Sequence, residues 1–159
     1  MDRTGYTILG IDPGSIKTGF GLIEVAANSY KHIENGLIVP PKDMVFKDRI
    51  GFIFSEVCEV IKEFHPDVIA LEDIFIAKNA QSALKLGHVR GAVMSAAVIH
   101  GLPLFEYTPT HVKQSVVGHG RAEKYQIQAM ICTLLGLKEP PYEDAADALA
   151  IALTHAFSM

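Results

Sequence analysis

Apolar and polar positions along the chain predict five short strands. The first apolar run, residues 6–12, is ended by Pro13 and Gly14, as is typical of a buried strand. The next two runs are separated only by a short polar turn, which predicts an antiparallel meander at the start of the chain. The strands are expected at residues 6–12, 18–26, 30–39, 68–72 and 104–107.

Apolar residues also recur at the three- and four-residue spacing of helices. The clearest case is residues 45–64, where Ile53, Val57 and Ile61 share one face and Glu56 lies on the other. Helices are expected at residues 45–64, 79–100, 122–135 and 145–157, and residues 108–117 are expected to form a loop with a helical turn. A meander followed by alternating helices and strands predicts an α/β fold with a mixed five-stranded sheet flanked by helices.

The composition is that of an ordinary globular domain. A length of 159 residues suits one domain, expected at residues 1–159. No apolar run approaches the roughly 20 residues that span a bilayer, so no membrane contact is expected. The first residues lack the basic start and apolar stretch of a signal peptide, which predicts a cytoplasmic location. Cys58 and Cys132 lack metal-ligand spacing and are expected to be reduced core thiols.

The net charge of −4 hides an uneven distribution. Residues 24–73 hold 5 basic and 10 acidic residues, a net charge of −5, whereas residues 74–132 hold 6 basic and 2 acidic residues, a net charge of +4. A basic surface beside a group of acids is what a metal-dependent nuclease needs, because cations hold phosphates while acids hold metal ions. Chance variation along an acidic protein is the alternative that the charges alone leave open.

Four carboxylates stand where predicted strands end or a predicted helix begins: Asp12, Glu72, Asp144 and Asp147. Each of three has a structural alternative, because Asp12 could be a turn residue and Asp144 and Asp147 could favour a helix start. Glu72 has none, because an acid at the end of a buried strand needs partners. Asp73 should point to the opposite face and is the weaker candidate. Acids brought together repel one another unless cations neutralise them, and two metal ions roughly 3.5 to 4 Å apart commonly hydrolyse phosphodiesters.

Small residues recur at steps of four along the helix expected at residues 79–100: Ala83, Gly87, Gly91 and Ser95. Such a stripe lets another backbone approach closely, at a cost in helix propensity for each glycine. Packing onto the protein's own sheet and a subunit interface are both open.

Four motifs, in order along nearly the whole chain, closely resemble the RuvC family of Holliday-junction resolvases. They are the residues around Asp12 with Thr18-Gly19, the segment from Ala77 to Gly91, Pro109-Thr110 with Val112-Lys113-Gln114, and Asp144-Ala-Ala-Asp147-Ala-Leu-Ala. The resemblance implies a ribonuclease H-like fold, a homodimer, and an endonuclease that nicks two opposing strands of a four-way DNA junction during recombination and repair. It also implies 5′-phosphate products and a partner complex of the RuvA and RuvB type that moves the junction.

The resemblance assigns roles to individual residues. The catalytic, metal-binding acids would be Asp12, Glu72, Asp144 and Asp147, holding Mg²⁺, with Mn²⁺ as a substitute and two ions per subunit. Lys113 and Lys124 would face the scissile phosphates. Phe75 would insert at the junction centre, unless it is a core residue, and further DNA contacts are expected from Lys78, Lys85, Arg90 and Arg121.

Two other classes of function are open. Asp12-Pro13-Gly14 with Gly19-Phe20-Gly21 also resembles the phosphate loop of actin-like nucleotide-binding proteins, although those close two such domains over a nucleotide. A junction-binding protein without activity is the second alternative, and the complete set of four acids argues against it.

Overall fold

A computed structural model describes residues 5–73 and 79–159 of the chain. Within these ranges five strands and five helices follow one another. The strands are β1 (Tyr6–Asp12), β2 (Thr18–Ala26), β3 (Ser29–Ile38), β4 (Val68–Glu72) and β5 (Leu104–Tyr107). The helices are α1 (Phe46–Phe64), α2 (Ala80–Ile99), α3 (Pro109–Val117), α4 (Lys124–Leu135) and α5 (Glu143–Ser158).

The strands form one mixed sheet, as predicted, and their order in it is β3-β2-β1-β4-β5. The first three strands are antiparallel, whereas β4 runs parallel to β1 and β5 runs parallel to β4. Ile11 pairs with Leu71, so Asp12 and Glu72 end adjacent strands at the same edge of the sheet. The topology therefore brings two of the predicted acids together.

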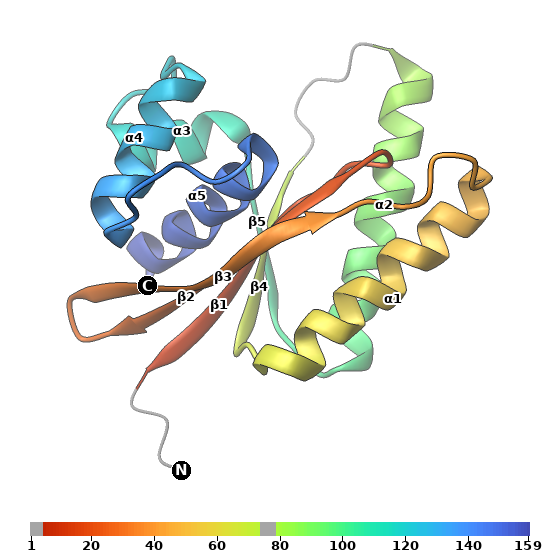
Figure 1. Ribbon diagram of the computed structural model, residues 1–159, viewed down its shortest axis with the longest axis horizontal. Helices are drawn as coiled ribbons and strands as arrows, with labels where there is room; N and C mark the ends of the chain where they lie inside the picture. Colours follow the sequence, from red (N-terminus) through yellow and green to blue (C-terminus); the bar gives the residue numbers. More distant parts are fainter. Residues whose placement is uncertain (1–4, 74–78) are drawn as a thin grey trace.

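Helices cover both faces of the sheet (Figure 1): α1 and α2 lie on one side, and α3, α4 and α5 on the other. Because side chains alternate along a strand, Leu9 and Ile11 of β1 join the core under α1 and α2, whereas Ile8 joins the core under α5. The same alternation directs Val68 and Ala70 of β4 toward α5. Asp12 and Glu72 continue these series and thus belong to the α5 face.

Helix α5 is buried along almost its whole length, from Ala145 to Ala156 apart from Asp147. Its backbone packs against glycines of β1 and β2. A Cβ atom at Gly10 would come within 2.0 Å of the Ala148 carbonyl oxygen, and one at Gly19 within 2.0 Å of the Asp144 carbonyl oxygen. No larger side chain fits at these two positions, so the glycines set how closely α5 approaches the sheet.

Several elements differ from the sequence predictions, β3 and α5 by one or two residues at their ends, and capping explains the differences at α3 and α4. Residues 109–117 form the regular helix α3 rather than a loop with a helical turn, because the Thr108 hydroxyl accepts a hydrogen bond of 3.2 Å from the His111 amide and Pro109 occupies the first turn. Helix α4 begins at Lys124 rather than at Ala122, because the Glu123 amide donates to Gln126 Oε1 over 2.8 Å.

The small-residue stripe of α2 faces outward. Gly87, Gly91 and Ser95 are exposed, and nothing lies within 4 Å of a Cβ built at either glycine. Together with Ala83, Leu84 and His88 they line an open groove. Of the two alternatives for this stripe, packing onto the protein's own sheet is therefore wrong.

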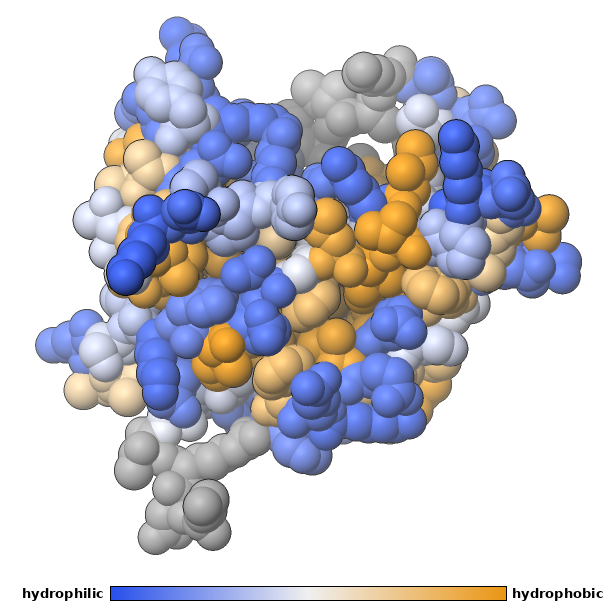
Figure 2. Space-filling view, in the orientation of Figure 1, coloured by the Kyte–Doolittle hydropathy of each residue, from blue (hydrophilic) through white to orange (hydrophobic). Residues whose placement is uncertain are grey.

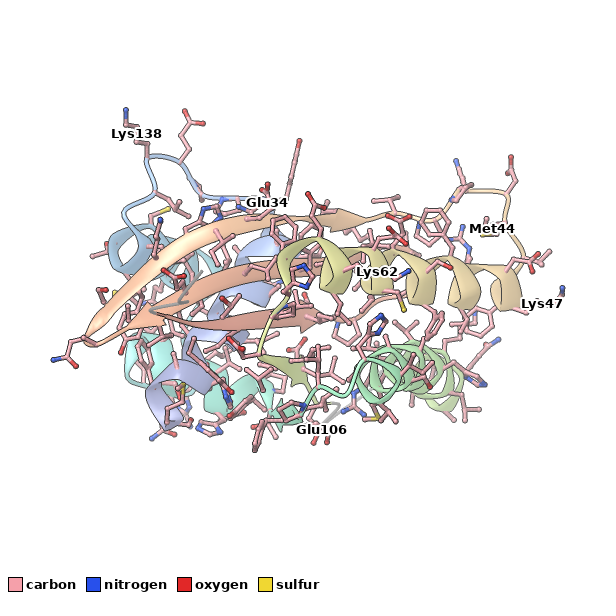
Figure 3. All side chains as sticks on the ribbon, turned by 90° about the horizontal axis from the view of Figure 1, so that it is seen from below. Glu34, Met44, Lys47, Lys62, Glu106 and Lys138 are labelled. Carbon is pink, nitrogen blue, oxygen red and sulfur yellow. The ribbon has the colours of Figure 1, made fainter. Side chains whose placement is uncertain are left out.

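The surface carries both hydrophilic and hydrophobic areas. Figure 2 shows a largely hydrophilic face with hydrophobic residues gathered to the right of its centre. Figure 3 shows Glu34 and Glu106, on the two edge strands, at opposite sides of the molecule, and Lys47 in the first turn of α1. No helix in residues 5–73 and 79–159 is both long and apolar enough to cross a membrane. Cys58 is buried, Cys132 is half-buried, and neither forms a disulfide.

Replacing Gly10 tests the close contact between β1 and α5. We expect Gly10→Ala to lower the free energy of unfolding by about 1–3 kcal/mol, because the added methyl group must push the Ala148 carbonyl away. Urea unfolding measures this loss. Gly51→Ala is the matched control: nothing lies within 4 Å of its Cβ position on α1, so helix propensity should raise stability by about 0.5–1 kcal/mol. Wild-type stability in Gly10→Ala would contradict the packing described above.

Candidate active site

Three of the four predicted acids meet above the carboxyl edge of the sheet. One carboxylate oxygen each from Asp12, Asp144 and Asp147 lies within 4.8 Å of the others. Asp12 comes from the end of β1, and the other two come from the first turns of α5, three residues apart on one face. Glu72 is outside this group of three but stands beside it, in a side-chain hydrogen bond with Asp12. The structure therefore brings all four predicted acids into one cluster.

The acids line a cleft of about 330 Å³ together with two of the predicted lysines. Lys113 comes from α3 and Lys124 from the first residue of α4, both of which pack against α5. Apolar side chains complete the lining: Pro109, Val112, Ile127 and Ile151. One cleft thus offers carboxylates and ammonium groups, which is the arrangement predicted for binding metal ions and phosphates together.

The carboxyl groups of the cleft outnumber the lysines that line it with them. Burial, the hydrogen bond to Glu72 and the nearby carboxylates raise the pKa of Asp12 far above its ordinary value. Burial also raises the pKa of Asp147 to about 6; the charges of Glu72 and Asp144 add to the rise, while Lys124 and Lys113 oppose it. Carboxyl groups that hold protons this strongly are poised to exchange them for cations.

The donor set fits a hard divalent cation. All the acidic ligands are carboxylates, which Mg²⁺ prefers, and the oxygens of the three clustered aspartates are close enough to share an ion. The raised pKa values point the same way, because a cation at the cluster would remove the repulsion that causes part of them. The acidic cluster is therefore compatible with divalent metal binding.

Asp73 is separate from the cluster, as the alternation along β4 predicted. Its carboxylate lies 3.4 Å from the Arg90 guanidinium on α2. Arg90 also pairs with Glu106 at 2.5 Å, and its Nε donates a hydrogen bond of 3.1 Å to the Glu72 carbonyl oxygen. Only 11% of the Arg90 side chain is exposed. Arg90 therefore braces the end of β4 behind Glu72, and its predicted DNA contact stays a prediction.

Of the remaining predicted DNA contacts, the two that the structure describes do not line the cleft. Lys85 on α2 and Arg121 between α3 and α4 are exposed. Phe75 and Lys78 fall outside the residues that the structure describes. For these residues the predicted contacts stay predictions.

One charged neighbour of the cluster was missed from the sequence. Lys17, on the turn between β1 and β2, places its Nζ 3.2 Å from Asp144 Oδ2. Only the register of β1 and β2 and the position of α5 reveal this proximity, because the two residues are far apart along the chain. On the other side of the same helix start, Lys124 pairs with Glu143.

A comparison with protein families matches residues 8–155 to the family described as crossover junction endodeoxyribonuclease RuvC. The chain belongs to the RuvC family. A RuvC of Citrifermentans bemidjiense is 55% identical over 95% of this chain and 92% of its own length. A RuvC of Trichlorobacter lovleyi is 49% identical over 93% of this chain and 83% of its own length.

Solved structures of RuvC support the same assignment. The structure of Thermus thermophilus RuvC in complex with a Holliday junction substrate has a TM-score of 0.91 and 39% identity, covering 96% of this chain and 94% of that one. A yeast mitochondrial Holliday junction resolvase, at 12% identity and a TM-score of 0.68, shares the fold. The predicted family, the ribonuclease H-like fold and the class of enzyme, an endodeoxyribonuclease, are confirmed.

The raised pKa of Asp147 predicts how pH affects stability without metal. Because the folded protein holds this proton more tightly than the unfolded chain, stability should fall as the pH rises from about 4 through 6. Asp147→Asn removes this loss. In EDTA at pH 7.5 we expect it to raise the Tm by on the order of 5 °C, with little difference at pH 4.

Differential scanning calorimetry with EDTA and with Mg²⁺ measures this effect. Mg²⁺ should stabilise the wild type more than Asp147→Asn. Asp43→Asn, at an exposed position before α1, is the matched control and should change neither curve. If Asp147→Asn were less stable than the wild type at pH 7.5 in EDTA, the ionised Asp147 carboxylate would not destabilise the metal-free protein, which would contradict this prediction.

Proposed function

We propose that this chain resolves Holliday junctions by metal-dependent nicking of two opposing DNA strands. The observation that carries the proposal is the cleft in which Asp12, Asp144 and Asp147 form a cluster while Lys113 and Lys124 line the same space. Membership of the RuvC family supports the substrate, since a family member of known structure was solved with a Holliday junction.

The four acids would hold the metal. We expect two Mg²⁺ ions per subunit, replaceable by Mn²⁺, with Asp12, Glu72, Asp144 and Asp147 as their ligands. Bound ions of this kind lower the pKa of a water molecule and stabilise the charge on a phosphate under attack. The protein's own contribution is rigidity, because two ligands end strands of the sheet and two begin a buried helix.

Lys113 and Lys124 would act on the DNA side. Their ammonium groups are near enough to Asp147 to oppose the rise of its pKa, so each lies within electrostatic reach of the cluster. There they would bind the scissile phosphate and stabilise the charge that develops on it. The expected products carry 5′ phosphates.

A homodimer suits this substrate, because a four-way junction has approximate two-fold symmetry and two equivalent sites could face two equivalent strands. The groove along Gly87, Gly91 and Ser95 supports this proposal, since its small side chains leave room for a second helix. Phe75 would insert at the junction centre, and Lys78, Lys85, Arg90 and Arg121 would make further DNA contacts.

We further propose that residues 1–159 act as one nuclease domain in the cytoplasm, with a branch-migration complex of the RuvA and RuvB type as partner. The match to the RuvC family does not favour the actin-like alternative, and the close approach of the Asp144 carbonyl accounts for the glycine at position 19. The complete cluster of acids argues against an inactive junction-binding protein.

The direct test is cleavage of a synthetic four-way junction beside a linear duplex of the same sequence. We expect symmetric nicks in the junction only, and only with Mg²⁺ or Mn²⁺. Asp144→Asn should bind the junction in a gel-shift assay yet cut it roughly 100-fold more slowly or worse, because it removes a metal ligand. Asp73→Asn is the matched control and should cut normally, since its carboxylate faces Arg90. Normal cleavage by Asp144→Asn would contradict the assignment.

Lys113 allows a separate test of how the cleft binds the scissile phosphate. We expect Lys113→Met to slow cleavage at saturating junction by roughly 10- to 100-fold while binding weakens much less, because one of several phosphate contacts is lost. Lys62→Met is the control, since Lys62 lies on α1 in an exposed pair with Glu59. Equal rates for the wild type and Lys113→Met under single-turnover conditions would remove Lys113 from the catalytic set.

A further inference from the structure

Lys17 is held beside the acidic cluster by a rigid turn. Its Nζ lies 3.2 Å from Asp144 Oδ2. Thr18 closes the turn at both ends of Gly14: its hydroxyl donates to the Gly14 carbonyl over 2.8 Å and accepts from the Gly14 amide over 3.2 Å. Arg49 of α1 adds a hydrogen bond of 3.2 Å to the Ser15 carbonyl. The backbone of Lys17 is therefore fixed, and only its side chain is free to choose a partner.

The ion pair of Lys17 and Asp144 is exposed on the lysine side. The Lys17 side chain is 54% exposed and that of Asp144 is 26% exposed. An ion pair this open to water is weak, and the four-carbon stem of a lysine lets its ammonium move by several ångströms. Lys17 can thus leave Asp144 at little cost when a stronger cation arrives.

The surroundings of the turn offer Lys17 a second partner. On the side of α2, Ser15 and Ile16 line a shallow pocket with Lys85, while Lys17 reaches toward α5. Lys17 therefore lies between Lys85 and the cleft that holds Lys113 and Lys124. A DNA strand that enters this cleft would carry its phosphates past these cations.

We propose that Lys17 is an exchangeable counter-ion of the active site. It neutralises Asp144 while no metal is bound; once a divalent cation takes its place at Asp144, the ammonium binds a backbone phosphate of the DNA next to the cleft. This inference rests on the proposed function and adds to it a positioning residue that couples metal binding to DNA binding.

The test compares Lys17→Met, which removes the charge and keeps most of the stem, with Lys17→Arg and with the remote control Lys62→Met. Mn²⁺ is titrated calorimetrically into metal-free protein without DNA. Lys17→Met should bind Mn²⁺ about two- to fivefold more tightly than the wild type, because it lacks the competing ammonium. Lys17→Arg and Lys62→Met should match the wild type.

Junction binding is then measured against salt concentration, with Ca²⁺ as the divalent ion. Here Lys17→Met should bind more weakly than the wild type, and the slope of log K against log salt should be shallower by about 1, as expected for one lost phosphate contact. Lys17→Arg should restore the slope.

Two results would overturn the inference: unchanged or weaker Mn²⁺ binding by Lys17→Met, or an unchanged salt slope. Either can occur while the wild type cleaves junctions normally, which would leave the proposed function intact. Failure of the wild-type protein to bind Mn²⁺ would instead contradict the metal site itself, and the inference with it.

Discussion

The contact between helix α5 and the glycines of β1 and β2 is the constraint on which the site depends. Gly10 and Gly19 leave no space between the sheet and the α5 backbone. The Asp144 carbonyl at the start of that helix lies against Gly19 of β2, which pairs with Asp12 at the end of β1. Any larger residue there would lift Asp144 and Asp147 away from Asp12. The burial of α5 between the sheet and helices α3 and α4 holds this position from the other side. Packing that looks purely structural therefore fixes the spacing of the clustered acids.

That packing has an electrostatic cost. Carboxylates forced together at a partly buried edge repel one another; burial, and after it this repulsion, raises the pKa values of Asp12 and Asp147. The fold tolerates it because protons, lysines or metal ions can occupy the cluster. Lys17 and Lys124 both pair with acids at the start of α5, one on each side, so the site has partial neutralisation of its own. A divalent ion would complete it, and the same charges that destabilise the empty site would then bind the ion tightly.

Sequence patterns predicted most of this arrangement, for identifiable reasons. Apolar runs bounded by turn residues predicted the five strands, and the order of helices and strands predicted their mixed sheet. Alternation along β4 predicted the opposite faces of Glu72 and Asp73, because successive side chains of a strand point to opposite sides. What could not be predicted depends on contacts between distant segments. The glycines next to Phe20 suggested a phosphate loop, whereas they serve the approach of α5. The bracing of the β4 end by Arg90 and the pairing of Lys17 with Asp144 both join separate elements of the fold, so neither could be predicted from the sequence. The DNA contact expected of Arg90 stays a prediction. The helix at 109–117 could have been predicted from the sequence, since Thr108-Pro109 is a regular helix start.

The most direct measurement is a crystal structure of the protein soaked in Mn²⁺, with anomalous scattering used to locate the ions. We predict anomalous peaks among the carboxylate oxygens of Asp12, Asp144 and Asp147, with Lys17 moved away from Asp144. Mn²⁺ bound elsewhere, or an empty cluster in crystals of protein that cleaves junctions in the same Mn²⁺ concentration, would contradict it.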